Sequence, residues 1–231
     1  MSRTLIPPLR LPTRTVVRVN RRLLWIDLAC KAALILALLH AVAFPDLPQY
    51  DGKGIGSRLF LYPISTYLVP IVWWIVRRKR PGLAYPYLID ICVCLPFMID
   101  TLGNTFNLYN TIEWWDDVMH FVTWVPWVCA FGLLIRGRPH LHRFDAWVMT
   151  AGFGAKTHIL WEIAEYFAFI KGNPNEYESA YKDTLGDLAL SLCGSLFGSL
   201  LVATVVWNLG RNRVDDRPPE GLESPALQLR S

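Results

Sequence analysis

The sequence predicts an all-α fold, a polytopic helical membrane bundle of about six transmembrane helices with both termini cytoplasmic. Three observations lead to this prediction. Of the 231 residues, 53% are hydrophobic and only 18% are charged, against about 25% charged in an average soluble domain. The apolar residues gather in runs long enough to cross a bilayer as helices. The basic residues alternate between dense and sparse in the links between those runs.

Six apolar runs have, or nearly have, the length that a membrane crossing requires. The predicted spans are 24–44, 59–76, 84–108, 115–135, 146–169 and 187–208. The second run is the shortest, and the third, fifth and sixth contain charged residues, so hydropathy defines their ends less sharply.

The predicted spans form one domain, because a membrane bundle of this size does not divide into two. We therefore expect a basic cytoplasmic segment at 1–23, a six-helix transmembrane domain at 24–208, and a tail at 209–231. The tail is polar and rich in proline, which favours disorder.

Lysine and arginine set the orientation of the bundle. Counted as far as Arg217, the two flanking segments and alternate links hold sixteen basic residues on one side and four on the other. The positive-inside rule places the richer side in the cytoplasm. The net charge of +4 follows from this asymmetry, so the bilayer is the expected partner and a nucleic acid is not. The sequence does not indicate any soluble partner.

The prediction therefore places the chain in the cell (inner or plasma) membrane. The basic N-terminal segment does not resemble a cleaved signal peptide, because a full-length span follows it with no small-residue cleavage site. The five cysteines all fall within predicted spans and form no C-x-x-C pair. We interpret them as small buried residues, not as redox or metal groups.

Four predicted spans bring acids or amides to the outer leaflet, although the orientation was assigned from lysine and arginine alone. Within each span the polar residues recur at helical spacing and so share one face. The stripes are Asp100, Asn104 and Asn107; Asp116 and His120; His158, Glu162 and Glu165; and Asp183 and Asp187. A charge facing lipid costs about 2.5–3.5 kcal/mol or more. The stripes are therefore expected to face the bundle interior and one another.

A cluster of carboxylates with an imidazole is a typical binding site for a divalent metal ion. The predicted metal ligands are Asp116, His120, Glu162, Glu165, Asp183 and Asp187. The first four are also the candidate catalytic residues. The identity of the ion stays open.

Each of these residues also has a structural interpretation. Asp116, Asp117 and Asp183 could cap helix N-termini or interact with the helix dipole. Helical geometry separates two adjacent acids, because Asp116 shares a face with His120 and Asp117 does not. We therefore assign Asp117 to the membrane interface. In the first span, Asp27 and Lys31 are spaced as an internal ion pair. Asp90 lies near the inner end of the third span, and we expect it to pair with the arginines of the nearby link.

Three motifs resemble the YjdF-like family of bacterial integral membrane proteins. They are Asp116-x-x-x-His120-Phe121, then Glu162-Ile163-Ala164-Glu165-Tyr166, then Asp183-Thr184-x-x-Asp187 followed by Gly194. The similarity covers about residues 84–205 and is also distantly VanZ-like. The family often has an arginine where this chain has Asp117. The resemblance implies that these acids belong to one site, and it implies no particular chemistry.

Three functions fit the sequence. The first is a metal-dependent enzyme acting on a lipid or headgroup substrate at the outer leaflet. The second is a cation- or proton-coupled transporter, or a membrane protein that binds a small molecule. The third is a structural or assembly protein whose acids only lock helices together. The crowding of polar groups at one leaflet, with no internal repeat, favours the first function or a simple binding site. No G-x-S-x-G motif, phosphate loop or dinucleotide fingerprint is present.

Overall fold

The structure, a computed structural model, describes residues 20–136, 138–171 and 177–209. Its regular elements are helices throughout this part of the chain, which confirms the all-α prediction. The predicted disorder of 209–231 concerns residues that lie almost wholly outside the described part, as does most of the basic segment 1–23.

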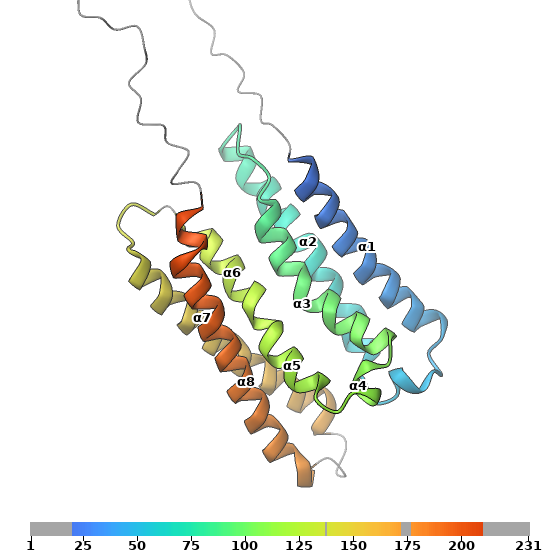
Figure 1. Ribbon diagram of the computed structural model, residues 1–231. Helices are drawn as coiled ribbons and strands as arrows, with labels where there is room; N and C mark the ends of the chain where they lie inside the picture. The colour runs from blue at the N-terminus through green and yellow to red at the C-terminus, as the bar shows by residue number, and fades with distance from the viewer. Residues whose placement is uncertain (1–19, 137, 172–176, 210–231) are drawn as a thin grey trace, which may run out of the picture.

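The helices follow one another up and down a bundle (Figure 1). In chain order they are α1 (Arg21–Ala43), η1 (Pro48–Tyr50), α2 (Ile55–Lys79), α3 (Tyr87–Thr105), α4 (Leu108–Thr111), α5 (Trp115–Val122), α6 (Trp124–Ile135), α7 (Arg143–Glu165), η2 (Tyr166–Ile170), α8 (Tyr177–Thr204) and η4 (Val206–Asn208).

Five segments of the described chain are long and apolar enough to cross a membrane. They are Arg21–Ala43, Ile55–Lys79, Tyr87–Thr105, Trp115–Ile135 and Ala180–Asn208. Helix α7 is as long as α1, at 23 residues, but it is not among the five. It carries Lys156, Glu162 and Glu165 in its second half. The protein is thus a helical membrane bundle, and a sixth crossing by α7 stays a prediction.

The predicted span 115–135 has the expected ends but is not one continuous helix. It is divided into α5 and α6 at Thr123. Pro126 is the physical reason, because its ring nitrogen cannot donate to the carbonyl of Val122 and its ring clashes with that carbonyl. The break separates the short α5, which carries His120, from the apolar α6.

The bundle consists of two halves joined by α3 and α6. In the first half α1, α2 and α3 enclose an apolar cluster around Leu34, Tyr62 and Cys94. In the second half α6, α7 and α8 enclose another around Val128 and Val202. A smaller cluster of Val69, Val93 and Ala130 connects α2 and α3 to α6.

Helix α8 lies close to the break between α5 and α6. Its buried face is made of small residues, among them Ser191, Ser195 and Ser199. A Cβ atom on Gly194 would lie 2.1 Å from the carbonyl oxygen of Phe121, so only glycine permits this approach. The contact sets α8 beside α5, because small residues let two helix backbones approach closely.

Helix α8 also begins earlier than predicted, at Tyr177 and not at 187. Asp183 therefore lies within the helix, which excludes its interpretation as an N-cap. The predicted boundary was late because Lys182 and Asp183 lower the local hydropathy.

The two ends of the bundle differ in charge. Helix α1 begins, α2 ends and α7 begins at one end, which bears Arg21, Arg78 and Arg143 (Figure 1). Asp116 begins α5 and Glu165 ends α7 at the opposite end. The cytoplasmic placement of the basic end stays a prediction.

Candidate metal centre

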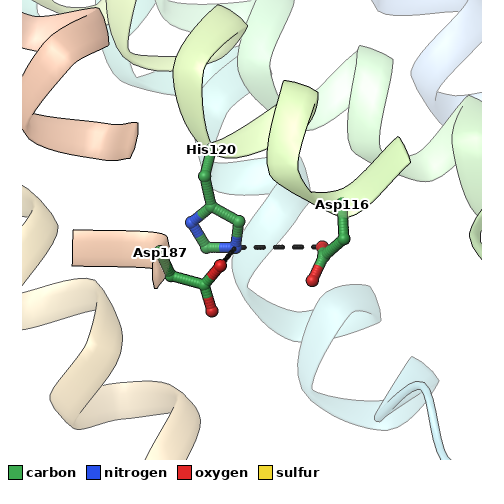
Figure 2. A group of neighbouring side chains, drawn as sticks. All are labelled: Asp116, His120 and Asp187. Atoms are coloured by element: carbon green, nitrogen blue, oxygen red, sulfur yellow. Dashed lines mark ion pairs between the residues drawn. The ribbon is translucent and has the colours of Figure 1, made fainter. Parts of the chain in front are cut away.

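His120 is the centre of the candidate site. It lies in the last turn of α5, with its side chain 10% exposed. Its Nε2 atom is 3.4 Å from Oδ1 of Asp187 and 3.8 Å from Oδ1 of Asp116. Figure 2 shows the two carboxylates turned toward this one nitrogen, from α8 and from the preceding turn of α5. Helical spacing places Asp116 on the His120 face, and the Gly194 contact brings Asp187 near it.

Helix α7 supplies two more carboxylates. Oε1 of Glu162 is 3.7 Å from Nδ1 of His120, on the other side of the ring. Glu162 is 8% exposed, and its Oε1 has no hydrogen-bond donor among the described residues. Glu165 joins this group, since His120, Glu162 and Glu165 offer ligand atoms that all lie within 4.8 Å of one another. His158 is buried one turn deeper, and its Nδ1 also has no described partner.

The structure thus brings together five of the six predicted ligands, Asp116, His120, Glu162, Glu165 and Asp187. It does not bring in Asp183, which is exposed on α8 and belongs to neither group of ligand atoms that closes on one point. Asp183 lies one helical turn before Asp187 on α8, which places Asp183 beyond the end of the cluster.

Sequence reasoning gave Ser191 no part in the site. The Ser191 hydroxyl is buried and lies 3.2 Å from Nδ1 of His120. A neutral imidazole with its proton on Nδ1 donates to this hydroxyl and leaves the lone pair of Nε2 facing Asp116 and Asp187. Its spacing of four residues from Asp187 was the available signal.

The arrangement around Nε2 has the dimensions of a metal site. Ligand atoms at about 2.0–2.2 Å from one ion lie about 3–3.5 Å from one another, close to the 3.4 and 3.8 Å separations observed. The ligand atoms of Asp116, His120 and Asp187 all lie within 4.8 Å. Because Nδ1 is bonded to Ser191, the Nε2 side is the better position for an ion.

A second cluster surrounds Asp100, and it is closed. Asp100 Oδ2 accepts from Arg58 Nε at 3.0 Å and from the Tyr62 hydroxyl at 2.6 Å, and Oδ1 accepts from the Tyr109 hydroxyl at 2.7 Å. Burial and the Asp100 carboxylate raise the pKa of the Tyr109 hydroxyl, which therefore keeps its proton and donates. Asp100 was expected to face the other polar stripes, and it does line the same cavity as His120, but its described hydrogen bonds do not include the His120 cluster.

A third cluster lies toward the basic end and corrects the predicted pairing of Asp90. Lys31 contacts Asp27 at 3.0 Å, as predicted, and it also contacts Asp90. The Tyr85 hydroxyl donates to the same Asp90 carboxylate. Asp90 therefore pairs with a lysine of α1 and not with the arginines of the link. Burial and the Asp90 carboxylate raise the pKa of Tyr85.

A cavity of about 360 Å³ connects the first two clusters. Asp116, His120 and Glu165 line it, and so do Arg58 and Asp100. The His120 cluster is thus accessible from a space large enough for part of an organic ligand.

Apolar helices packed around a buried carboxylate–imidazole cluster define the chain as a multi-pass membrane protein. The comparison with protein families agrees. The family described as "Predicted membrane protein (DUF2238)" matches residues 29–208, and the chain belongs to it. This is the YjdF-like family, so the resemblance is confirmed, whereas the VanZ-like link is unsupported. No curated protein and no solved structure matched.

Proposed function

We propose that the protein binds a divalent metal ion between Asp116, His120 and Asp187. One observation carries the proposal, namely that the carboxylates of Asp116, Glu162 and Asp187 surround a single buried imidazole, two of them buried and that of Asp116 half exposed. Glu162 in particular has a buried oxygen with no described donor. Like charges collected away from water are stable only if they take up protons or a cation.

Glu162 and Glu165 add two further carboxylates around His120. Oxygen ligands with one imidazole suit Mn²⁺, Fe²⁺ or Zn²⁺ better than Cu⁺, which prefers sulfur. A bundle core that presents carboxylates and histidine from facing helices is a known way to hold such ions.

With an ion bound, the site supports hydrolysis of a lipid or headgroup substrate at the outer leaflet. A divalent ion lowers the pKa of a bound water and polarises a carbonyl or phosphoryl oxygen. Glu165 lines the cavity beside His120, where it can accept a proton from that water. Glu162 does not line the cavity and lies on the Nδ1 side of His120, so its part is to add negative charge beside the ion.

Elemental analysis of detergent-purified protein tests the metal proposal. We expect about one Mn, Fe or Zn ion per chain and its loss in His120→Ala. A matched control is His40→Ala, because His40 bonds Tyr50 outside the cluster and its loss removes no ligand. Absence of metal in wild-type protein, even after growth with added Mn²⁺, Fe²⁺ and Zn²⁺, would reject the proposal.

The enzyme function has its own test. Wild-type protein in liposomes, loaded with the metal, should release a water-soluble headgroup or a free fatty acid, detected by mass spectrometry of the extracted lipids. Glu165→Gln should keep the metal and lose the product. If the protein binds metal but releases no product from any of a panel of bacterial lipids, the enzyme function is rejected and a metal-binding function remains.

A carrier is the second candidate, and the Lys31 cluster favours it. The ionisable groups of Asp27, Lys31 and Asp90 lie toward the basic end of the bundle, at a different depth from His120. Carriers need such groups at several depths. Uptake of ⁵⁴Mn²⁺ into proteoliposomes tests it. Uptake lost in both His120→Ala and Asp90→Asn would favour the carrier over the enzyme.

We also propose that the basic end faces the cytoplasm of the cell and that the membrane is the inner membrane. The support is the arginine-rich end formed by α1, α2 and α7 (Figure 1). Among reporters fused at position 215, only those that require the cytoplasm for activity should be active. Activity of a periplasm-specific reporter at the same position would reverse the orientation.

A further inference from the structure

The cavity beside the His120 cluster lies between the two halves of the bundle and has two chemically different ends. The polar residues that line one end include Arg58, Asp100, Tyr109, Asp116, His120 and Glu165. Its apolar lining includes Leu61, Pro96, Phe97, Trp127, Leu160 and Trp161. A ligand that fills both ends must therefore be amphipathic.

The two ends also lie at different depths along the helices. On α7 the lining runs from Glu165, at the helix end, back to Leu160 and Thr157. On α5 and α6 it runs from Asp116 to Trp127. At 1.5 Å of rise per residue these stretches correspond to about 12–17 Å. The apolar end thus reaches into the hydrocarbon depth while the polar end stays near the surface.

The apolar end opens sideways. Leu61 on α2 and Leu160 on α7 both line the cavity, yet they are 47% and 64% exposed. Helices α2 and α7 belong to different halves and do not pack extensively against each other. In a bilayer the exposed faces of these leucines meet lipid, so the gap between α2 and α7 forms a lateral opening.

The size of the cavity limits the ligand. At about 360 Å³ it stands at the lower end of the range for ligand pockets, about 300–1,000 Å³. It admits one hydrocarbon chain segment and cannot enclose a whole two-chain lipid. The lateral opening removes this difficulty, because the remainder of the molecule can stay in the bilayer.

Arg58 does not make the polar end an independent anion site. It is held by Asp100 at 3.0 Å, and the pair is neutral as a whole. The remaining charged groups facing the cavity are Asp116, His120 and Glu165. Recognition of an oxygen-bearing headgroup therefore depends on the ion bound at the His120 cluster.

We infer that the substrate of this site is a lipid carrying a phosphate ester, which inserts one hydrocarbon chain sideways between α2 and α7. Its chain packs against Phe97, Trp127 and Trp161, and its phosphate reaches the ion at His120. The part of this inference that concerns the phosphate rests on the proposed metal site. The part that concerns the hydrocarbon chain rests on the cavity and its lateral opening.

A photoreactive lipid tests the inference. The probe is a phospholipid with a diazirine near the middle of one chain, incorporated in liposomes with the full-length protein and located by peptide mass spectrometry. We expect the label to concentrate on the apolar lining, at Trp127, Leu160 and Trp161. Labelling spread evenly over all exposed apolar faces would overturn the inference.

Substitutions at the opening sharpen the test. Leu160→Trp and, on the other rim, Leu61→Trp narrow the opening and should each reduce labelling of Trp127 several-fold while the metal content stays at the wild-type level. Leu196→Trp is the matched control, since Leu196 is exposed on α8 and does not line the cavity. Undiminished labelling in both rim variants would contradict lateral insertion.

The two proposals fail separately. Labelled lining residues in a wild-type protein that holds no metal would support the chain pocket and reject the metal site. Metal in the wild type without label in the cavity would reject the chain pocket and leave the metal site standing.

Discussion

Two kinds of polar cluster lie within the bundle, and they differ in how their charges are balanced. Around Lys31 and around Arg58, each buried acid contacts a basic side chain and a tyrosine hydroxyl or a second acid. Around His120, three carboxylates contact one imidazole, and none of their described ion pairs involves a lysine or arginine. In the first kind every acid has a lysine or arginine partner, although one oxygen each of Asp27 and Asp90 has no described hydrogen-bond donor. In the second kind no described lysine or arginine offsets the acids, so a cation or protons must come from outside.

This difference distinguishes polar clusters that stabilise the fold from polar clusters that bind a ligand. A buried charge with its partners in place stabilises one packing of the helices, and removal of one partner is strongly destabilising. A cluster of unbalanced acids lowers stability until a ligand arrives, as functional sites often do. The two kinds of cluster should therefore respond in opposite ways to loss of charge.

The largest effect is expected at Lys31. Lys31→Met leaves Asp27 and Asp90 buried without a cation, so the free energy of unfolding should fall by about 3–5 kcal/mol. The measurement is the apparent melting temperature in detergent at one fixed scan rate. Lys156→Met is the control, because Lys156 is exposed and forms no ion pair with a described residue. Equal losses in the two variants would contradict the structural role of the Lys31 cluster.

The next effect separates the adjacent acids of α5. Asp116→Asn removes a ligand, so bound metal and melting temperature should fall together, because metal-binding energy is also folding energy. Asp117 is exposed and forms no described ion pair or hydrogen bond with His120. Asp117→Asn should therefore change stability by no more than about 0.5 kcal/mol. If both variants lose metal equally, the two acids do not divide their roles as we propose.

A smaller effect is expected at Ser191. Ser191→Ala frees Nδ1 of His120 and should weaken metal affinity about 10- to 100-fold, as is usual when the partner of a metal-binding histidine is lost. Ser199→Ala is a matched control on the same buried face, because the Ser199 hydroxyl bonds the backbone of Ser195 and does not contact His120. Titration of metal into chelator-treated protein compares them. Similar affinities for both variants would show that Ser191 only packs.

The smallest expected effect is an increase in stability, at Glu162. In chelator, Glu162→Gln should raise the free energy of unfolding by about 0.5–2 kcal/mol, because it removes a buried negative charge from an unbalanced cluster. The same variant should bind metal less tightly. A lower melting temperature for Glu162→Gln in chelator would mean that Glu162 has a structural partner, and the contrast between the clusters would fail.

Much of the fold followed from the sequence, because membrane crossing imposes simple rules. The length of the apolar runs identified α1, α2, α3 and the two ends of the segment 115–135. Hydropathy did not reveal the break at Thr123, whose cause is the local effect of Pro126 on the helix. It also placed the beginning of α8 ten residues late, because charged residues at a helix end resemble a link.

The candidate site was predictable in its members and less so in its partners. Helical spacing united Asp116 with His120 and Glu162 with Glu165, since residues of one face share one environment. Helical spacing could not exclude Asp183 from the site, because a residue at the end of a polar stripe has the same spacing as the residues within it. It could not show that Asp100 pairs with Arg58 or that Asp90 pairs with Lys31. Those contacts join different helices and depend on rotations that periodicity does not fix.

The contrast between the clusters depends on one claim, that a metal ion balances the acids around His120. The most direct test is the melting temperature of the wild type and of Asp187→Asn, in chelator and again after Mn²⁺ or Zn²⁺ is restored. A free ion at 100 times its Kd stabilises the folded state by about 2.7 kcal/mol. The account predicts a lower wild-type midpoint in chelator, recovery with metal, and a midpoint for Asp187→Asn that responds to neither. A wild-type midpoint that ignores both chelator and metal, or equal responses in the two proteins, would contradict it.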